Sequence, residues 1–192
     1  MDLNTTTGAV TYFLEKGKAN TDQTLQLAKK RASELNLKTI LVASTDGDTG
    51  VKAVKIFQGY KVIVVGHVHG FTAPNKQTLT TENRVAIEAG DGTILITGHA
   101  FAGVNRAIRT KLNTYEINEI IAHTLRILGE GMKVSCEIAL MAADAGLVRT
   151  DEDVIAIAGT GRGADTAVVL KPANSHTFFD LRVREIICKP RL

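Results

Sequence analysis

Short apolar runs, each followed by a turn and then a stretch of helical spacing, recur along the chain. Residues 40–43, 61–66 and 154–158 are apolar almost throughout, which is typical of strands buried on both faces of a parallel sheet. Residues 21–35 place Leu and Ala at helical spacing, with Lys and Glu on the other faces, as in a helix that lies against a sheet. This alternation predicts an α/β fold with a largely parallel sheet covered on both faces.

Capping residues and shorter apolar runs predict the remaining helices and strands. Asn20, with Gln23 three residues on, is placed to cap the first helix, and Thr80 or Thr81 to cap a helix that ends at Ala89. The connections between the last three strands are short enough for antiparallel pairing, so we expect a mixed sheet. Further strands are predicted at residues 10–14, 93–97, 166–170 and 182–188, and further helices at 117–128 and 132–147.

Composition narrows the classes of function. A chain of 192 residues with 44% hydrophobic content suits one domain over residues 1–192. The formal charge of +3 is nearly balanced and the basic residues are scattered, which argues against nucleic acid. No export signal stands at the N-terminus and no apolar stretch approaches the roughly 18 residues that cross a bilayer, so no membrane is expected. The apolar content favours a homo-oligomer, although no pattern marks an interface.

The two cysteines, Cys136 and Cys188, lie in apolar segments and form no metal-ligand spacing, so we expect buried, inert thiols in a cytoplasmic protein. His67, His69 and His99 have no Cys or carboxylate at ligand spacing, which argues against a metal site and leaves hydrogen bonding, stacking or an incidental placement open.

Glycine and polar residues follow four of the predicted strands, where a parallel sheet has its ligand crevice. In the first of these turns, Gly47 allows close approach of the backbone, and the helix that follows offers its free amides and dipole. The turn is therefore a candidate phosphate cradle, or alternatively an ordinary capped turn. The candidate ligand-binding residues at the four strand ends are Ser44, Thr45, Gly47, Asp48, Thr49, Gly66, His67, Gly98, Gly161, Arg162 and Asp165.

The glycine-rich segment Gly159–Ala164 resembles G-x-G-x-x-G but leads into a strand, and no G-x-x-x-x-G-K-[ST] occurs, so neither a standard dinucleotide site nor Walker-type hydrolysis is expected. Arg162 is suited to an anionic or planar ligand, with Asp165 fixing its orientation; a hairpin carrying a surface ion pair is the alternative. Glu137 and Asp144 are seven residues apart on one helix face, as an acid–base pair or as a solvated surface.

Several segments taken together resemble stand-alone proteins similar to the C-terminal α/β domain of pyruvate kinase, a family of archaea and some bacteria. The resemblance covers nearly the whole chain. The segments are Tyr12-Phe13 leading to Asn20-Thr21, Val42–Thr49, Cys136–Asp144, Arg162–Val169 and Glu185–Pro190.

This resemblance implies a three-layer α/β/α sandwich, with a mostly parallel sheet, antiparallel C-terminal strands and a phosphate-binding loop at Ser44–Thr49. It also implies flavin mononucleotide (FMN) as the ligand, with the ribityl phosphate on that loop and the flavin ring near the other strand ends. Pyruvate kinase activity is not implied, because this chain lacks the barrel domain that carries it.

The leading hypothesis is therefore a protein that binds a phosphorylated small molecule, FMN in particular; if it is an enzyme, it is a flavin-dependent oxidoreductase. The alternative is a regulatory or sensor domain that binds a sugar phosphate or nucleotide without catalysis. A purely structural subunit is a third interpretation. With no Trp in the chain, a flavin ring would have to stack on Phe71, Phe101, a His or apolar side chains.

Overall fold

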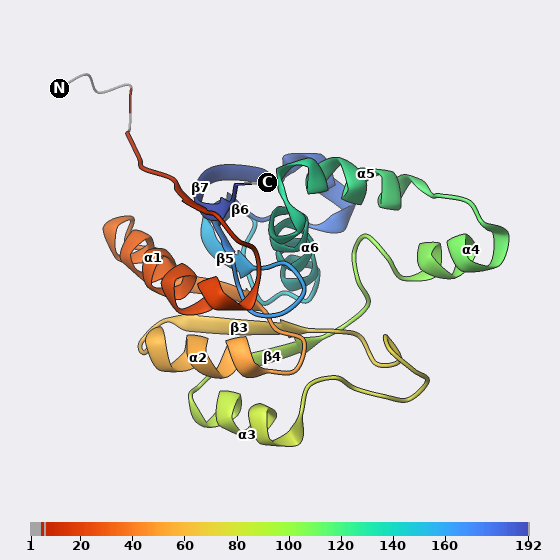
Figure 1. Cartoon of the computed structure of the whole chain (residues 1–192), viewed down its shortest axis with the longest axis horizontal. Coiled ribbons are helices and arrows are strands. Elements are labelled where there is room, and N and C mark those ends of the chain that lie inside the picture. The colour runs from red at the N-terminus through yellow and green to blue at the C-terminus, as the bar shows by residue number, and fades with distance from the viewer. Residues whose placement is uncertain (1–4, 6, 192) are drawn as a thin grey trace.

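A seven-stranded sheet with helices on both faces forms the body of the computed structural model, which describes residue 5 and residues 7–191 (Figure 1). The strand order is β1-β7-β6-β5-β2-β3-β4, and β6 alone runs against its two neighbours. This confirms the α/β fold and the mixed sheet. The strands are β1 (Thr11–Phe13), β2 (Thr39–Ala43), β3 (Lys61–Gly66), β4 (Thr93–Ile96), β5 (Val154–Ala158), β6 (Thr166–Lys171) and β7 (Arg182–Pro190).

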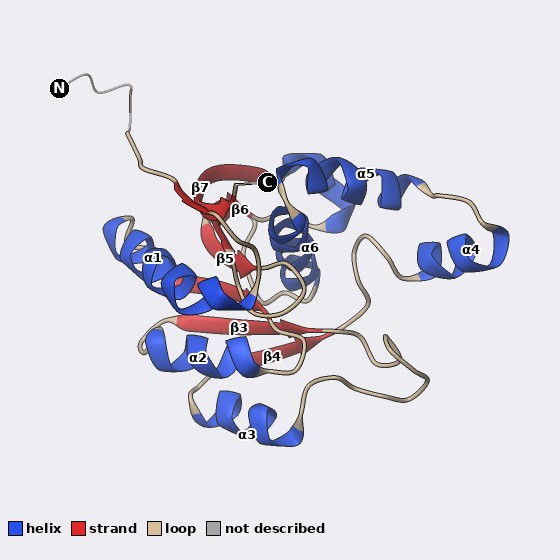
Figure 2. Cartoon of the chain, viewed as in Figure 1, coloured by secondary structure: helices blue, strands red, loops and turns tan. Residues whose placement is uncertain are grey.

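Helices cover the sheet in two layers, seen as blue ribbons around the red strands in Figure 2. Ile40 and Val42 of β2 pack in the core beneath α1 and α2, whereas Leu41 belongs to the opposite core beneath α6. Apolar side chains on both faces of β2 explain its unbroken apolar run. The helices are α1 (Thr21–Glu34), α2 (Asp48–Ile56), α3 (Thr81–Ala89), α4 (Val104–Leu112), α5 (Ile117–Leu125) and α6 (Glu130–Asp144), with short 3-10 turns η1 (Lys18–Asn20), η2 (Arg126–Leu128) and η3 (Ser175–Asp180).

The central helix, α6, begins earlier than the sequence predicted and ends three residues before residue 147. Gly129, at φ 114°, starts it, and Gly131 lies in its first turn where a Cβ would be 2.5 Å from Thr166 Cβ. Gly131, which lies between the two predicted helices, therefore allows α6 to approach β6 closely.

Two helix starts test the capping predictions. Thr80 Oγ1 accepts the N–H of Asn83 at 3.2 Å, which confirms Thr80 as the cap of α3. The Asn20 prediction is wrong, because its side chain makes no cap bond and its amide donates to the Glu15 carbonyl at 2.7 Å. Instead, the Thr21 hydroxyl donates a hydrogen bond to the Lys18 carbonyl at 2.7 Å, at the start of α1.

Helix α4 was not predicted, and in Figure 1 it lies at the end of an arm that extends from the body. None of its residues is buried. The apolar face predicted for residues 117–128 is also partly open, since Ile117 and Ile120 are exposed. Among the described residues, no helix combines the length and apolar character that crossing a membrane requires.

Candidate functional site

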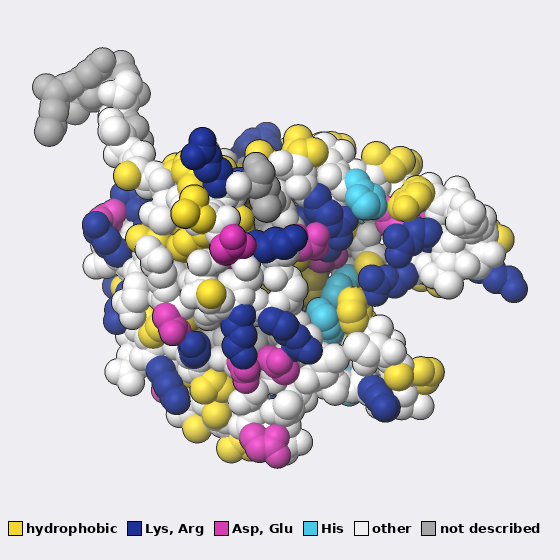
Figure 3. Space-filling view, in the orientation of Figure 1, with side chains coloured by type: hydrophobic (Ala, Val, Ile, Leu, Met, Phe, Trp, Pro, Cys, Tyr) yellow, Lys and Arg dark blue, Asp and Glu magenta, His cyan; other side chains and the backbone are white. Residues whose placement is uncertain are grey.

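One cavity of about 440 Å³ lies at the carboxyl ends of β2, β3, β4 and β5 and extends beneath α4, α5 and α6. The ends align because Val42 of β2 is level with Val64 of β3 and Ile157 of β5. Figure 3 shows the hollow with His side chains in cyan and Lys and Arg side chains in dark blue around it. The predicted residues that line it are Ser44, Thr45, Thr49, Gly66, His67, Gly161 and Arg162.

The turn between β2 and α2 is built around Gly47, which has φ 105° and precedes α2. A Cβ at Gly47 would lie 2.7 Å from Leu79 Cδ1, so no other residue fits without displacing its neighbours. Asn83 donates to the Asp46 carbonyl at 3.0 Å and to Asp48 Oδ1 at 3.1 Å. Gly47 and Asp48 thus shape the turn rather than line the cavity.

The backbone amides of this turn lie beside Ser44, Thr45 and Thr49, which line the cavity. Gly50 N–H donates to Ser44 Oγ at 3.3 Å, and Asp48 N–H donates to Asp46 Oδ1 at 3.2 Å. Within the part of the chain that the structure describes, four further N–H groups of this turn have no acceptor: those of Thr45, Asp46, Gly47 and Thr49. Free amides at a helix N-terminus, beside the Thr49 side chain, form the kind of site that binds a phosphate.

Arg162 contacts this turn. Its Nη1 lies 2.6 Å from Asp46 Oδ2, so it joins the loop after β5 to the loop after β2. The prediction that Asp165 orients Arg162 is wrong. Asp165 is fully buried, and its Oδ2 accepts the N–H groups of Gly17 at 2.8 Å and Thr160 at 3.1 Å. Asp165 anchors the base of the glycine loop and is not part of the cavity lining.

An aromatic cluster of His67, Phe71 and His99 forms the next part of the cavity. The Phe71 ring lies 4.0 Å from the His67 ring and 5.1 Å from the His99 ring, centroid to centroid. His99 Nε2 accepts the Val68 N–H at 3.3 Å, which fixes its orientation. Gly98 precedes His99 without lining the cavity.

The remaining histidine of the sequence analysis, His69, is exposed near Gln77. Among the residues described, no group of three or more His, Cys, Asp or Glu side chains could hold a metal ion.

Burial favours the neutral form of both cavity histidines. Burial, followed by the nearby His99, Arg162 and Arg106, lowers the pKa of His67 to about 4. Burial also lowers the pKa of His99. A neutral imidazole can donate and accept hydrogen bonds or stack against a planar ring.

The shifted pKa of His67 predicts a pH dependence of stability. The unfolded chain takes up the proton near the ordinary His value of about 6.5, whereas the folded chain takes it up only near pH 4. Stability is therefore complete above pH 6.5 and falls as the pH drops from 6.5 toward 4. Thermal melts across this range should show a smaller loss for His67→Gln than for wild type. His69→Gln, in the exposed part of the same loop, should follow wild type; an unchanged slope in His67→Gln would contradict the assignment.

The far part of the cavity is lined by charges from α4, α5 and α6 that the sequence analysis did not single out. Three cations there are paired with carboxylates: Arg109 with Glu119 at 3.1 Å, Arg126 with Glu130 at 2.5 Å, and Lys133 with Glu137. Arg106 has no carboxylate partner among the described residues, and its guanidinium lies 4.6 Å from the Phe71 ring centroid. With Arg162 and Asp46, the lining holds five cations and four carboxylates, which favours an anionic ligand.

Glu137 and Asp144 are not a catalytic pair. Glu137 Oε1 accepts the Phe101 N–H at 3.1 Å inside the cavity. Asp144, at the other end of α6, accepts the Ser175 N–H at 2.9 Å and the Asn174 amide at 3.2 Å. Two turns of helix separate them, so each carboxylate has its own structural partners.

The cysteines are buried, as predicted. Cys136 and Cys188 are both fully buried, one in each core. Burial raises the pKa of the Cys136 thiol to about 12 and that of Cys188 to about 11. Neither thiol is available as a nucleophile at neutral pH.

The mostly parallel sheet, the aligned strand ends and the charged cavity define an α/β sandwich domain of the ligand-binding class. Residues 22–170 match the family described as pyruvate kinase, alpha/beta domain. The chain belongs to this family. The match spans every loop of the cavity and leaves out β1 and β7, which pair with each other at one side of the sheet.

Proposed function

We propose that this protein binds a phosphorylated small molecule with a planar ring, and that the ligand is FMN. The observation that carries the proposal is the arrangement of one cavity: free helix-terminal amides at the β2–α2 turn and aromatic side chains at the neighbouring strand ends. A phosphate and a ring joined by a short polar chain satisfy both parts at once.

The phosphate end is supported by the amides of Thr45, Gly47 and Thr49 and by the positive end of the α2 dipole. Arg162 lies at the same turn, where its guanidinium can form paired hydrogen bonds with a phosphate while Asp46 holds it in position. Lys18, 3.5 Å from Asp48, reduces the negative charge near the turn.

The ring end is supported by the cluster of His67, Phe71 and His99, which supplies the stacking surface that a chain without Trp otherwise lacks. FMN would contribute hydride and electron chemistry when bound. The residues described here would bind and orient it, and the buried Lys133–Glu137 pair would set the charge beside it.

A regulatory domain that binds a sugar phosphate or a nucleotide is the second candidate. The polar far part of the cavity, with its Arg–Glu pairs, suits hydroxyl groups as well as a ring edge. Family membership agrees with a regulatory, ligand-binding role.

The first test is an absorbance spectrum of freshly purified protein, followed by calorimetric titration with FMN and riboflavin. We expect flavin bands and preference for FMN. Thr49→Ala should weaken FMN binding roughly tenfold or more, because a hydrogen bond to a charged group is lost, and leave riboflavin unchanged. Thr124→Ala, an exposed threonine on α5, is the matched control.

If wild type and Thr49→Ala bind FMN with equal affinity, the phosphate does not bind at the β2–α2 turn. A colourless protein that binds no flavin but is stabilised against heat by sugar phosphates or nucleotides would favour the regulatory candidate.

A further inference from the structure

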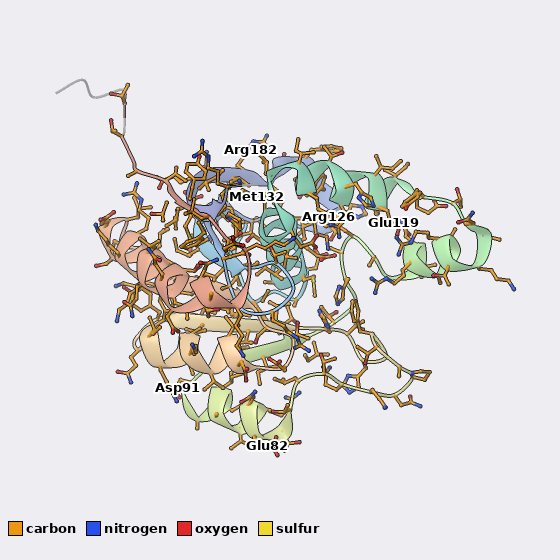
Figure 4. The ribbon with its side chains drawn as sticks, viewed as in Figure 1. Glu82, Asp91, Glu119, Arg126, Met132 and Arg182 are labelled. Carbon is orange, nitrogen blue, oxygen red and sulfur yellow. The ribbon has the colours of Figure 1, made fainter. Side chains whose placement is uncertain are left out.

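Glu119 is a buried carboxylate at the far end of the cavity. It lies on α5 on the side that faces α4, as Figure 4 shows, and is only 7% exposed. Its Oε1 is 3.1 Å from Arg109 Nε. Its Oε2 is covered by protein and has no hydrogen-bond partner among the residues that the structure describes.

A buried carboxylate oxygen without a donor is costly, and native structures rarely contain one. The other Arg–Glu pair of the cavity lining shows the contrast. Arg126 reaches both oxygens of Glu130, with Nε at 2.5 Å from Oε2 and Nη2 at 3.3 Å from Oε1. Glu119 therefore lacks one donor where Glu130 lacks none.

Arg109 adds donors beside this free acceptor. Its ion pair with Glu119 is formed through Nε, so the N–H groups on its two Nη atoms remain for another partner. The guanidinium is planar and fixed, and it also lies 5.7 Å from the Tyr115 ring. An acceptor and a donor thus stand side by side at one end of a cavity whose other end suits a phosphate.

We infer that Glu119 and Arg109 recognise a ring edge in which an N–H group stands next to a carbonyl group. The N–H donates to Glu119 Oε2, and the carbonyl accepts from an Arg109 Nη group. The imide edge of the flavin ring, N3–H between two carbonyls, has this pattern. This inference rests on the proposed function: it identifies the imide edge as the part of the ligand that Glu119 and Arg109 bind.

Helix α4 gives the ligand access to the covered oxygen. It buries none of its residues, and it is bounded by Gly103 at φ 56° and Asn113 at φ 51°. A nine-residue helix with no buried face has little packing to hold it in place. Binding at Glu119 Oε2 therefore requires a small shift of α4 that uncovers this oxygen and keeps Arg109 within reach of the ligand.

The test compares FMN with its N3-methyl analogue, which keeps the phosphate and the ring but loses the N3 donor. By calorimetry, wild type should bind the analogue roughly tenfold or more weakly, because the Glu119 hydrogen bond is lost. Glu119→Gln should bind FMN more weakly and no longer distinguish the two flavins. Glu185→Gln, which lies outside this cavity and has both oxygens paired with Arg31, should distinguish them as wild type does.

The outcomes separate this inference from the proposed function. If wild type binds FMN and its N3-methyl analogue equally, or if Glu119→Gln still distinguishes them, the inference is overturned while FMN binding stands. The wild-type comparison needs no variant, so it decides the question even if Glu119→Gln fails to fold.

If no FMN binds, uridine monophosphate and its N3-methyl analogue repeat the test with another imide. If the protein distinguishes these two nucleotides, the role of Glu119 is supported and flavin is excluded as the ligand. Failure to bind either imide would overturn the inference together with the flavin assignment.

Discussion

Replacing Asp165 by alanine is expected to lower the melting temperature by about 6–20 °C, from a loss of roughly 3–5 kcal/mol spread over a domain of this size. Asp165 is fully buried and accepts two backbone N–H groups, from Gly17 and Thr160, as well as the Thr166 hydroxyl at 2.8 Å. Alanine leaves these donors without an acceptor. Differential scanning calorimetry measures the change directly.

Two comparisons make the Asp165 prediction specific. Asp165→Asn keeps one acceptor oxygen for both N–H groups, so its melting temperature should fall less than that of Asp165→Ala. Asp151→Ala removes an exposed carboxylate that pairs with Arg149 and should melt like wild type. A melting temperature of Asp165→Ala within about 2 °C of wild type would show that the loop does not depend on this anchor.

The strands were the most predictable part of the fold. Residues 61–66 and 154–158 form strands with the predicted bounds, because a strand buried on both faces must be apolar along its whole length. Their order in the sheet could not be predicted locally. That β1 pairs with β7, at the other end of the chain, depends on contacts that no short window contains.

Helix α4 was missed for a related reason. Its sequence, Val104–Leu112, presents no face that is buried and has neither a side-chain N-cap nor an acidic first turn. Val104, Ile108 and Leu112 do recur at helical spacing, but the segment is only nine residues long and carries no N-terminal capping signal, so its start is not marked in the sequence. Asn113, left-handed just after the helix, and the basic residues Arg109 and Lys111 in its last turn are local signs of a helix end.

Some residues of the candidate site could be predicted from the sequence, and others could not. Ser44–Thr49 could be found from sequence because a strand, a glycine turn and a helix start are adjacent in the chain. Arg109, Glu119 and Lys133 look like solvated charges on helices, and only the fold places them around one cavity. The partner of Arg162 was mistaken because Asp165 is near in sequence, whereas Asp46 is near in space.

Breaking the buried Lys133–Glu137 pair should have the other large effect. Lys133 is 7% exposed and Glu137 4%, and Glu137 also accepts the Phe101 N–H. Glu137→Ala leaves a buried ammonium and a buried N–H without partners, so the free energy of unfolding should fall by about 3–5 kcal/mol. Urea denaturation at pH 7 measures this change. If the free energy of unfolding falls with urea concentration at the same slope in wild type and Glu137→Ala, their unfolded states are comparable.

The double variant Lys133→Met, Glu137→Gln tells whether the pair serves stability or ligand binding. It removes both charges and keeps an acceptor for Phe101 N–H, so most of the lost stability should return, because uncharged residues that replace a buried ion pair avoid its desolvation cost. Lys133 lines the cavity, so the double variant should bind FMN more weakly than wild type even though its stability returns. Recovery of FMN affinity together with stability would mean that the Lys133 charge is structural, whereas a stable double variant with weak binding assigns that charge to the ligand.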